Sequence, residues 1–370
     1  MIDERLKTLA KNLVCYSVDV QKGENILIEG SFSDTELVHE CIKQVYARGG
    51  FPFYNFTDPS TRRVMALGAT TESIERKIDI EAYRMNKMDG YIGIRGGYNS
   101  FEMEDVSPEA MKAEGKFFSK VHHDIRVKKT KWVVLRYPTP SFAQMAGMST
   151  ERFEDFYFNV CCLDYSKMDK AMQNLKALME RTDKVRILDA KTDLRFSIKG
   201  QPAIPCAGKL NIPDGEVYSA PIKTSVEGYI QYSAPSIQNG VKHDNIRLEF
   251  EKGKIVKATS SNTEAITQVF DTDEGARYVG EFAIGVNPYV TKPMLDTLFD
   301  EKIAGSIHFT PGACYDECPN GNNSAIHWDI VHIQTPEYGG GEIYFDDVLI
   351  RKDGMFVLPE LYCLNPENLK

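Results

Sequence analysis

The sequence pattern of the chain changes near residue 183. Before this point, short β-favouring segments alternate with segments whose apolar residues recur at helical spacing. After it, short β-like runs follow one another with turn-forming residues between them. The first pattern predicts an α/β domain with a mostly parallel sheet, and the second predicts an α+β domain rich in antiparallel sheet. We therefore expect two domains, at 1–183 and 184–370, which agrees with the length of 370 residues.

The first domain opens with an α/β unit. After a helical pattern near residues 3–20, the run Asn25–Glu29 predicts a strand. Ser33 and Glu36 form a capping-box pattern that starts the next helix, and a pair of glycines ends that helix. The run Phe51–Phe56 predicts the following strand. A strand, a helix and a strand at this spacing indicate a parallel pair joined by a right-handed crossover.

The rest of the first domain continues this alternation. We expect strands at Gly90–Ile94 and Lys131–Leu135 and helical structure from Thr150 to about Glu180. Sheets of this kind often bind nucleotides, but the chain contains neither GxGxxG nor GxxxxGK[ST]. The sequence therefore shows no recognisable loop for binding phosphate groups.

The second domain is read as strands with few helices. The β-like runs are VRILD, LRFSI, NIRLEF, KIVKAT, IHWDIVHI and EIYFDDVLI. Helical spacing returns only near Thr263–Val269 and Lys292–Phe299.

Composition limits the classes of partner and the compartment. The formal net charge of -9 argues against nucleic acid or an anionic membrane as the main partner, because both favour a basic surface. No run approaches the roughly 18 apolar residues needed to span a bilayer. The first residues are acidic and amphipathic, unlike a signal peptide, so we expect a cytoplasmic protein.

The eight cysteines form no CxxC pair, so we expect them to be free thiols. Cys314 and Cys318 lie close to the candidate site described next, and we interpret them as bystanders rather than as metal ligands.

The segment Ser306–Asp329 carries the strongest indication of chemistry. It contains two of the seven histidines, and the second begins the triplet HWD. On a strand, His327 and Asp329 would point to one side and the tryptophan between them to the other. His308 lies in a short β-favouring run that could bring a second imidazole nearby. Imidazole and carboxylate ligands suit zinc and neighbouring divalent ions, so the segment predicts a metal-dependent hydrolase.

Two carboxylates earlier in the second domain are further candidates. Glu216 follows a turn, and Glu281 lies inside the apolar, glycine-bounded segment GEFAIG. Burial of Glu281 there would be costly unless a cation or hydrogen-bond donors met it. Taken singly, each of these residues has an ordinary structural explanation, such as a hydrogen-bonded pair or an exposed turn acid.

Four of these segments occur in the order found in one family of metallopeptidases, and the chain resembles the aminopeptidase T and aminopeptidase S family. The matching segments are NIPDGEV at Asn211–Val217, GEFAIG at Gly280–Gly285, EKIAGSIH at Glu301–His308 and HWD at His327–Asp329, with KGENILI at Lys22–Ile28 and AGMSTERFEDF at Ala146–Phe156 in the first half. The similarity therefore covers most of the chain.

The resemblance implies an exopeptidase with two adjacent divalent ions, which could be zinc, cobalt or manganese. Its metal ligands would be Glu216, Glu281, His308, His327 and Asp329, and its catalytic tyrosine Tyr315. The family forms homodimers around a chamber that restricts substrates to short peptides.

Three questions stay open at this point. Either Glu216 or Glu281 could carry the proton from water to the leaving amine. The enzyme could also act on a non-peptide amide, or the chain could be a binding protein without catalysis. We interpret Glu301 and Lys302 as surface charges at a helix end, and His332 as a packing residue.

Overall fold

The computed structural model describes residues 3–99, 101–107, 109–111, 115 and 118–370, and the chain forms two compact units. The first contains Met1–Cys162 together with Gly208–Ile212, and the second contains Leu163–Ala207 together with Pro213–Lys370. The sequence pattern changes near residue 183, whereas the helix α8 (Tyr165–Arg181) already belongs to the second unit.

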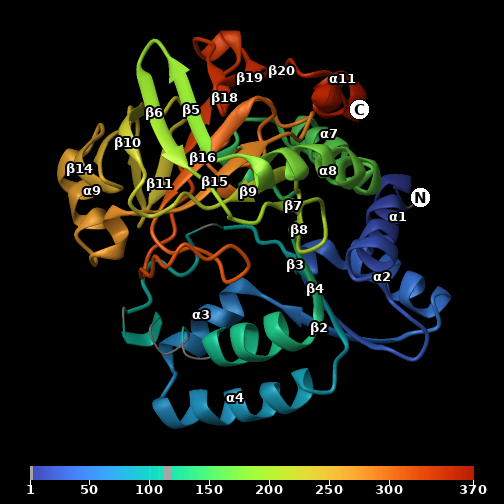
Figure 1. The fold of residues 1–370 in the computed structure, drawn as a ribbon. Helices are drawn as coiled ribbons and strands as arrows, with labels where there is room; N and C mark the ends of the chain where they lie inside the picture. The colour runs from blue at the N-terminus through green and yellow to red at the C-terminus, as the bar shows by residue number, and fades with distance from the viewer. Residues whose placement is uncertain (1–2, 100, 108, 112–114, 116–117) are drawn as a thin grey trace. The chain divides into compact units, whose positions relative to one another are not determined.

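The first unit is built on a parallel sheet with the strand order β2-β1-β3-β4-β8. Its strands are β1 (Asn25–Ser31), β2 (Phe51–Thr57), β3 (Gly90–Arg95), β4 (Lys131–Arg136) and β8 (Asn211–Ile212). Its α-helices include α1 (Glu4–Lys11), α2 (Thr35–Ala47), α3 (Pro59–Leu67), α4 (Thr71–Met85), α6 (Pro140–Met145) and α7 (Thr150–Cys161), with π-helices at Asn12–Ser17 and Phe118–Val127 and a 3-10 turn at Phe32–Asp34. Figure 1 shows β1 to β4 in blue to teal.

Local hydrogen bonds explain two differences from the predicted helices of this region. The capping box is formed by Ser31 and Asp34 instead of Ser33 and Glu36, since the Asp34 carboxylate accepts from the Ser31 backbone N–H at 2.7 Å. The long helical pattern after Thr150 is divided into α7 and α8, because the Asp164 side chain accepts from the backbone N–H groups that begin α8.

The second unit contains two antiparallel sheets and a two-stranded ribbon. The larger sheet has the order β14-β13-β10-β6-β5-β18-β19-β20, and the smaller has the order β17-β16-β15-β9-β7. The strands of the larger sheet are β5 (Lys184–Asp189), β6 (Thr192–Ser197), β10 (Glu227–Gln231), β13 (Arg247–Glu251), β14 (Lys254–Thr259), β18 (Glu342–Phe345), β19 (Val348–Lys352) and β20 (Met355–Phe356). Those of the smaller sheet are β7 (Ile204–Cys206), β9 (Glu216–Ser219), β15 (Val279–Gly285), β16 (Ser306–Pro311) and β17 (Val331–Ile333), and the ribbon pairs β11 (Ser236–Gln238) with β12 (Val241–His243).

Helices of the second unit other than α8 are short. They are α9 (Thr263–Phe270), α10 (Thr297–Asp300) and α11 (Pro366–Leu369), with 3-10 turns at Gly275–Arg277, Pro336–Tyr338 and Pro359–Leu364. The helix predicted over Lys292–Phe299 is wrong: Leu295 has a left-handed φ of 63°, and α10 begins only after Asp296. The Asp300 carboxylate accepts from the backbone N–H groups of Met294 and Leu295, so a side chain satisfies these groups in place of a helix turn.

The predicted fold class is confirmed, because a helix-flanked parallel sheet is followed by a unit of antiparallel sheets. All eight cysteines are free thiols. Across the described ranges, no helix is both long and apolar enough to cross a membrane.

Candidate metal centre

Three neighbouring strands of the smaller antiparallel sheet present candidate ligands on one face. Glu216 is the first residue of β9, Glu281 lies on β15 and His308 on β16, and all three are buried. In the strand register, Glu216 is opposite Gly285 and His308 is opposite Ala283. Positions 281, 283 and 285 alternate onto the same face, so the two carboxylates and the imidazole point the same way. Figure 1 shows β16, β15 and β9 together in the second unit.

The two glycines of GEFAIG let other segments approach this sheet. A Cβ at Gly285 would lie 2.5 Å from the carbonyl oxygen of Ile303, and a Cβ at Gly280 would lie 2.1 Å from that of Ala313. Real Cβ atoms do not approach backbone oxygens so closely. Because position 285 has no side chain, residues 301–303 can pack against the sheet. Because position 280 has none, the loop after β16 can pack against it as well. Both glycines therefore help to assemble the site.

The HWD triplet lies just before β17 and not within a regular strand. His327 forms an isolated bridge with Gly312, and the strand starts only at Val331. The expected orientation nevertheless holds: the His327 Nε2 is 3.2 Å from the Asp329 Oδ1, while Trp328 is buried on the other side and donates to Ser236. The prediction of a common point for this imidazole and carboxylate is confirmed, although the strand is shorter than expected.

Distances between these side chains define two groups of three ligands that share Glu281. In one group the His308 Nε2 lies 3.0 Å from the Glu281 Oε1 and 3.5 Å from the Glu216 Oε2. In the other the His327 Nε2 lies 3.4 Å from the Glu281 Oε2 and 3.2 Å from Asp329. Within each group the ligand atoms all lie within 4.8 Å of one another. The structure thus brings together all five residues that the sequence suggested as ligands.

The hydrogen bonding of these residues fits a divalent cation. Among the described residues, no hydrogen-bond partner is found for the buried Oε2 atoms of Glu216 and Glu281 or for the His327 Nε2. The His327 Nδ1 lies 2.8 Å from the carbonyl oxygen of Ala313, and since a carbonyl can only accept, Nδ1 carries the proton. When the ring is neutral, this contact leaves the Nε2 lone pair facing the carboxylates, and this is the form of the ring that binds metal. Thr310, two residues after His308 on the same face, donates to the Asp329 Oδ1 at 2.8 Å and fixes that carboxylate.

Without a bound metal ion, the carboxylates of the site favour positive charge on the two histidines. Burial alone would lower the pKa of His308, but Glu216 and Glu281 outweigh it and raise the value to about 10. Burial is likewise outweighed at His327, where Asp329 and Glu281 raise the pKa to about 12. Without metal, protons therefore occupy the nitrogens that a metal ion would bind.

Tyr315 lies on the loop after β16, beside the second group of ligands. Its ring centroid is 4.7 Å from that of His327 and 5.6 Å from that of Tyr218. Partial burial and the carboxylates of Asp329 and Glu281 raise the pKa of its phenol, although the residue is 46% exposed. The phenol therefore keeps its proton at neutral pH and can donate a hydrogen bond.

The interpretation of Glu301 and Lys302 as surface charges is wrong. The Lys302 side chain is 2% exposed, and its ammonium group donates to the Glu216 Oε1 at 2.6 Å and lies 2.7 Å from the Glu301 Oε1. Asp214 lies 3.5 Å from the same ammonium group. These residues were missed because a charged pair after a short helix has the same local pattern whether it is exposed or buried. Their place inside a family-like segment, EKIAGSIH, was the available signal.

Other candidate residues lie outside the metal-ligand groups found among the described residues. Cys314 and Cys318 bond instead to the backbone carbonyls of Asn322 and Pro202, which agrees with their interpretation as bystanders. His332 is buried with its Nε2 2.7 Å from the Asp189 carboxylate, so it has a hydrogen-bond partner in addition to its packing.

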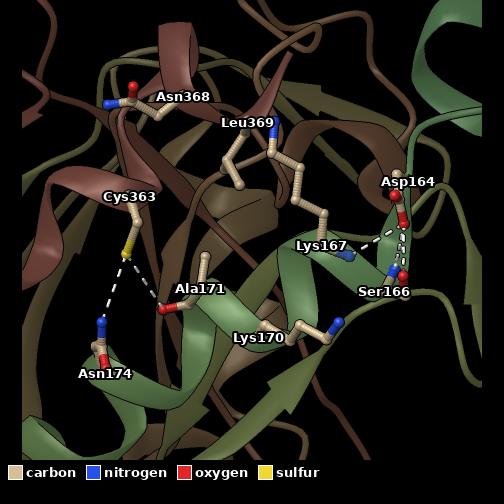
Figure 2. Close-up of a pocket in the computed structure, with 9 residues that line it drawn as sticks. All are labelled: Asp164, Ser166, Lys167, Lys170, Ala171, Asn174, Cys363, Asn368 and Leu369. Carbon is tan, nitrogen blue, oxygen red and sulfur yellow. Dashed lines mark hydrogen bonds between the residues drawn. The ribbon is translucent and has the colours of Figure 1, made fainter.

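A surface pocket of about 380 Å³ also lies in the second unit, between the start of α8 and the C-terminal residues (Figure 2). It is lined by Asp164, Ser166, Lys167, Lys170, Ala171, Asn174, Cys363, Asn368 and Leu369. It contains no histidine and no group of metal ligands among the described residues, so the chemistry indicated above is not located there.

Comparison with known proteins agrees with the chemistry of this cluster. A protein family described as "thermophilic metalloprotease (M29)" matches residues 2–356 of this chain. The chain belongs to the M29 metalloprotease family. The prediction of a metal-dependent peptidase of the aminopeptidase T and aminopeptidase S family is thereby confirmed.

Individual relatives of this M29 chain match over most of their length. Aminopeptidase PepS of Streptococcus thermophilus is 27% identical, with 84% of each chain covered. Aminopeptidase T of Thermus thermophilus is 25% identical, with 86% of this chain and 87% of the relative covered.

Solved structures confirm the fold of the M29 chain. Wild-type AmpT from Thermus thermophilus superimposes with a TM-score of 0.80 at 20% identity, over 96% of this chain and 99% of that one. A 2,5-dihydroxypyridine dioxygenase from Pseudomonas putida superimposes with a TM-score of 0.61 at 14% identity, covering 98% of this chain and 99% of that one. The same fold therefore occurs in a dioxygenase, so the fold alone does not determine the function.

Proposed function

We propose that this M29 protein removes N-terminal residues from short peptides, using two divalent ions held in the cluster around Glu281. The observation that carries the proposal is the position of Glu281, whose two oxygens face two different histidines. Glu216, Glu281 and His308 would hold one ion, and Glu281, His327 and Asp329 the other. The relatives' names, which describe aminopeptidases, support N-terminal residues as the point of cleavage.

The count of two ions is supported by the two groups of candidate ligands that share Glu281. Five carboxyl groups surround the site: Asp214, Glu216, Glu281, Glu301 and Asp329. The ammonium group of Lys302 contacts three of them. Burial raises the pKa of Glu216 and that of Glu301, and a bound divalent ion would favour their ionised forms. Nitrogen and oxygen ligands of this kind accept zinc, cobalt or manganese.

Divalent ions held by these residues would supply Lewis acidity for the peptide carbonyl and would lower the pKa of a bound water. The chain's own residues do the rest. The Tyr315 hydroxyl, protonated at neutral pH, donates a hydrogen bond to the oxygen of the tetrahedral intermediate. Glu301, whose carboxyl group lies near His308 and Asp329 and is assigned to neither ion, is our candidate for taking the proton of the attacking water and passing it to the leaving amine. Glu281, one of the two carriers expected from the sequence, has both of its oxygens facing the ion positions and so keeps none free for that proton.

We also propose that the protein is a homodimer. The edge strand β2 exposes Phe51, Phe53 and Tyr54. In the same unit, α3 exposes Val64, Met65 and Leu67, and α4 exposes Ile80 and Tyr83. An apolar edge strand left open is an aggregation hazard, so a second copy of the chain is a suitable cover. Free cysteines support a cytoplasmic location.

Hydrolysis of aminoacyl-p-nitroanilides tests the proposal. Chelator-stripped protein refilled with zinc, cobalt or manganese is expected to release p-nitroaniline, and N-acetylation of the substrate is expected to abolish release. Equal cleavage of acetylated and free substrates would instead support an amidohydrolase that acts on non-peptide amides. Metal binding without release from any substrate would favour a binding protein.

A further inference from the structure

Lys302 is a buried cation beside the candidate metal ligands. Its segment crosses the sheet at the place that Gly285 leaves open, with the Glu301 carbonyl oxygen 3.0 Å from where a Cβ at 285 would be. The Lys302 ammonium group then meets three carboxylates, those of Glu216, Glu301 and Asp214. Burying an ammonium group costs several kcal/mol unless such partners compensate it, so this arrangement persists only with all of its members in place.

The contact with Glu216 decides which oxygen this carboxylate can offer to a metal ion. Lys302 takes the Oε1 at 2.6 Å, and the Oε2 is left buried, without a hydrogen-bond partner, 3.5 Å from the His308 Nε2. A charge-assisted hydrogen bond of this length holds the carboxylate firmly. Glu216 is therefore limited to a single ligand oxygen, and that oxygen is aimed at the His308 group.

The same ammonium group fixes Glu301 in the space between the two ligand groups. Glu301, His308 and Asp329 place ligand atoms within 4.8 Å of one another, and these two partners belong to different groups. Lys302 holds the Glu301 Oε1 at 2.7 Å. One cation thus orients carboxylates that face both ion positions.

Lys302 also lies at a third cluster of possible ligands. Cys206, Asp214 and Glu216 place ligand atoms within 4.8 Å of one another, which is a spacing that could hold an ion. The ammonium group is within 3.5 Å of both carboxylates of this cluster. The position is therefore already filled by a positive charge that belongs to the chain.

We propose that Lys302 is a positioning residue that restricts the centre to two divalent ions, by fixing Glu216 and Glu301 through one oxygen each and by occupying the cluster of Cys206, Asp214 and Glu216. This inference rests on the proposed two-ion function. It assigns Lys302 no contact with substrate.

The test compares ion content and cobalt spectra of the whole protein and its variants. Wild-type protein equilibrated with excess Co²⁺ and desalted is expected to hold two ions per subunit, by elemental analysis, without thiolate-to-cobalt absorption in the near ultraviolet. Lys302→Met is expected to hold a third ion and to show that absorption, because Cys206 becomes a ligand. Adding Cys206→Ala to this variant should remove both signals. Lys199→Met, a change of a side chain that is 76% exposed, is the matched control and should behave as wild type.

Each outcome decides between the proposals. A folded Lys302→Met protein with two ions and no thiolate absorption overturns the role of Lys302, while the two-ion function stands. If Lys302→Met does not fold, the wild-type measurement decides, since a third ion or a thiolate band there refutes the inference. A wild-type protein that binds fewer than two ions contradicts the proposed function itself.

Discussion

Binding of metal to the stripped protein is expected to release protons, and their number follows from the structure. The carboxylates around the site raise the pKa of His308 to about 10 and that of His327 to about 12. At pH 7.5 both rings are therefore more than about 99% protonated in the metal-free protein. Each must become neutral to bind an ion, so these two rings release about two protons per subunit when both ions bind.

The sign of the pH dependence follows from this release. Because protons and metal ions compete for the same nitrogens, lower pH weakens metal binding and higher pH strengthens it. With two protons released, the overall association constant rises about 100-fold per pH unit below pH 10. In the metal-free protein, fold stability depends on pH in the opposite direction. The raised histidine pKa values stabilise the fold fully below about pH 6.5, and this stabilisation is lost as the pH rises through 10 to 12.

Calorimetry provides the assay. Zn²⁺ is titrated into stripped protein at pH 7.5 in buffers of different ionisation enthalpy, and the slope of the observed enthalpy against that ionisation enthalpy gives the number of protons released. His327→Gln should release about one proton fewer, while His332→Gln, outside the ligand groups, should match wild type. Binding of two ions with a slope near zero would refute the argument, because it would mean that the histidines are already neutral.

Three further results are expected. Tyr315→Phe should keep both ions and the melting temperature but lower kcat by about 10²–10³, or about 2.7–4 kcal/mol, and near-normal turnover would exclude its role as a donor. Glu281→Gln should weaken both ions and Asp329→Asn only one, so that elemental analysis finds less than one ion in the first variant and about one in the second; equal losses would contradict a shared Glu281. Gly285→Ala should destabilise the fold by about 1–3 kcal/mol in urea titrations, since the new Cβ meets a backbone oxygen at 2.5 Å, whereas Gly68→Ala, with its nearest atom at 3.7 Å, should not.

Much of the architecture could be predicted because it depends on local periodicity. The strand, helix and strand of the first unit are visible in residues 25–57, and the hairpin-rich second unit is visible in its short β-like runs. The five residues that the structure brings close together as candidate ligands could also be predicted, since four ordered segments together are far more specific than any single one. Thr310 could have been added from its place two residues after His308 on one strand.

The rest depended on tertiary contacts that local patterns do not encode. Nothing in the sequence near Lys302 shows that its segment crosses Gly285, so its burial could not be inferred from the pattern of charges. The predicted helix over residues 292–299 failed for a similar reason, because Asp300, on the far side of the turn, binds the backbone of Met294 and Leu295. The capping box was displaced by two residues, from Ser33 to Ser31, since both serines precede a suitable carboxylate.

The division of the chain into two units limits how the protein can be truncated. The backbone changes unit after Cys162, after Ala207 and after Ile212, so no single cleavage releases the second unit intact. A fragment that starts at residue 184 would lack α8, whose Tyr165 hydroxyl accepts from the Asp214 backbone two residues before Glu216. It would also carry β8 without its partner β4. Truncation to the C-terminal half therefore removes two contacts of the residues that lead into β9, so a fragment that keeps the second unit has to retain α8 and replace the β8 excursion by a short loop.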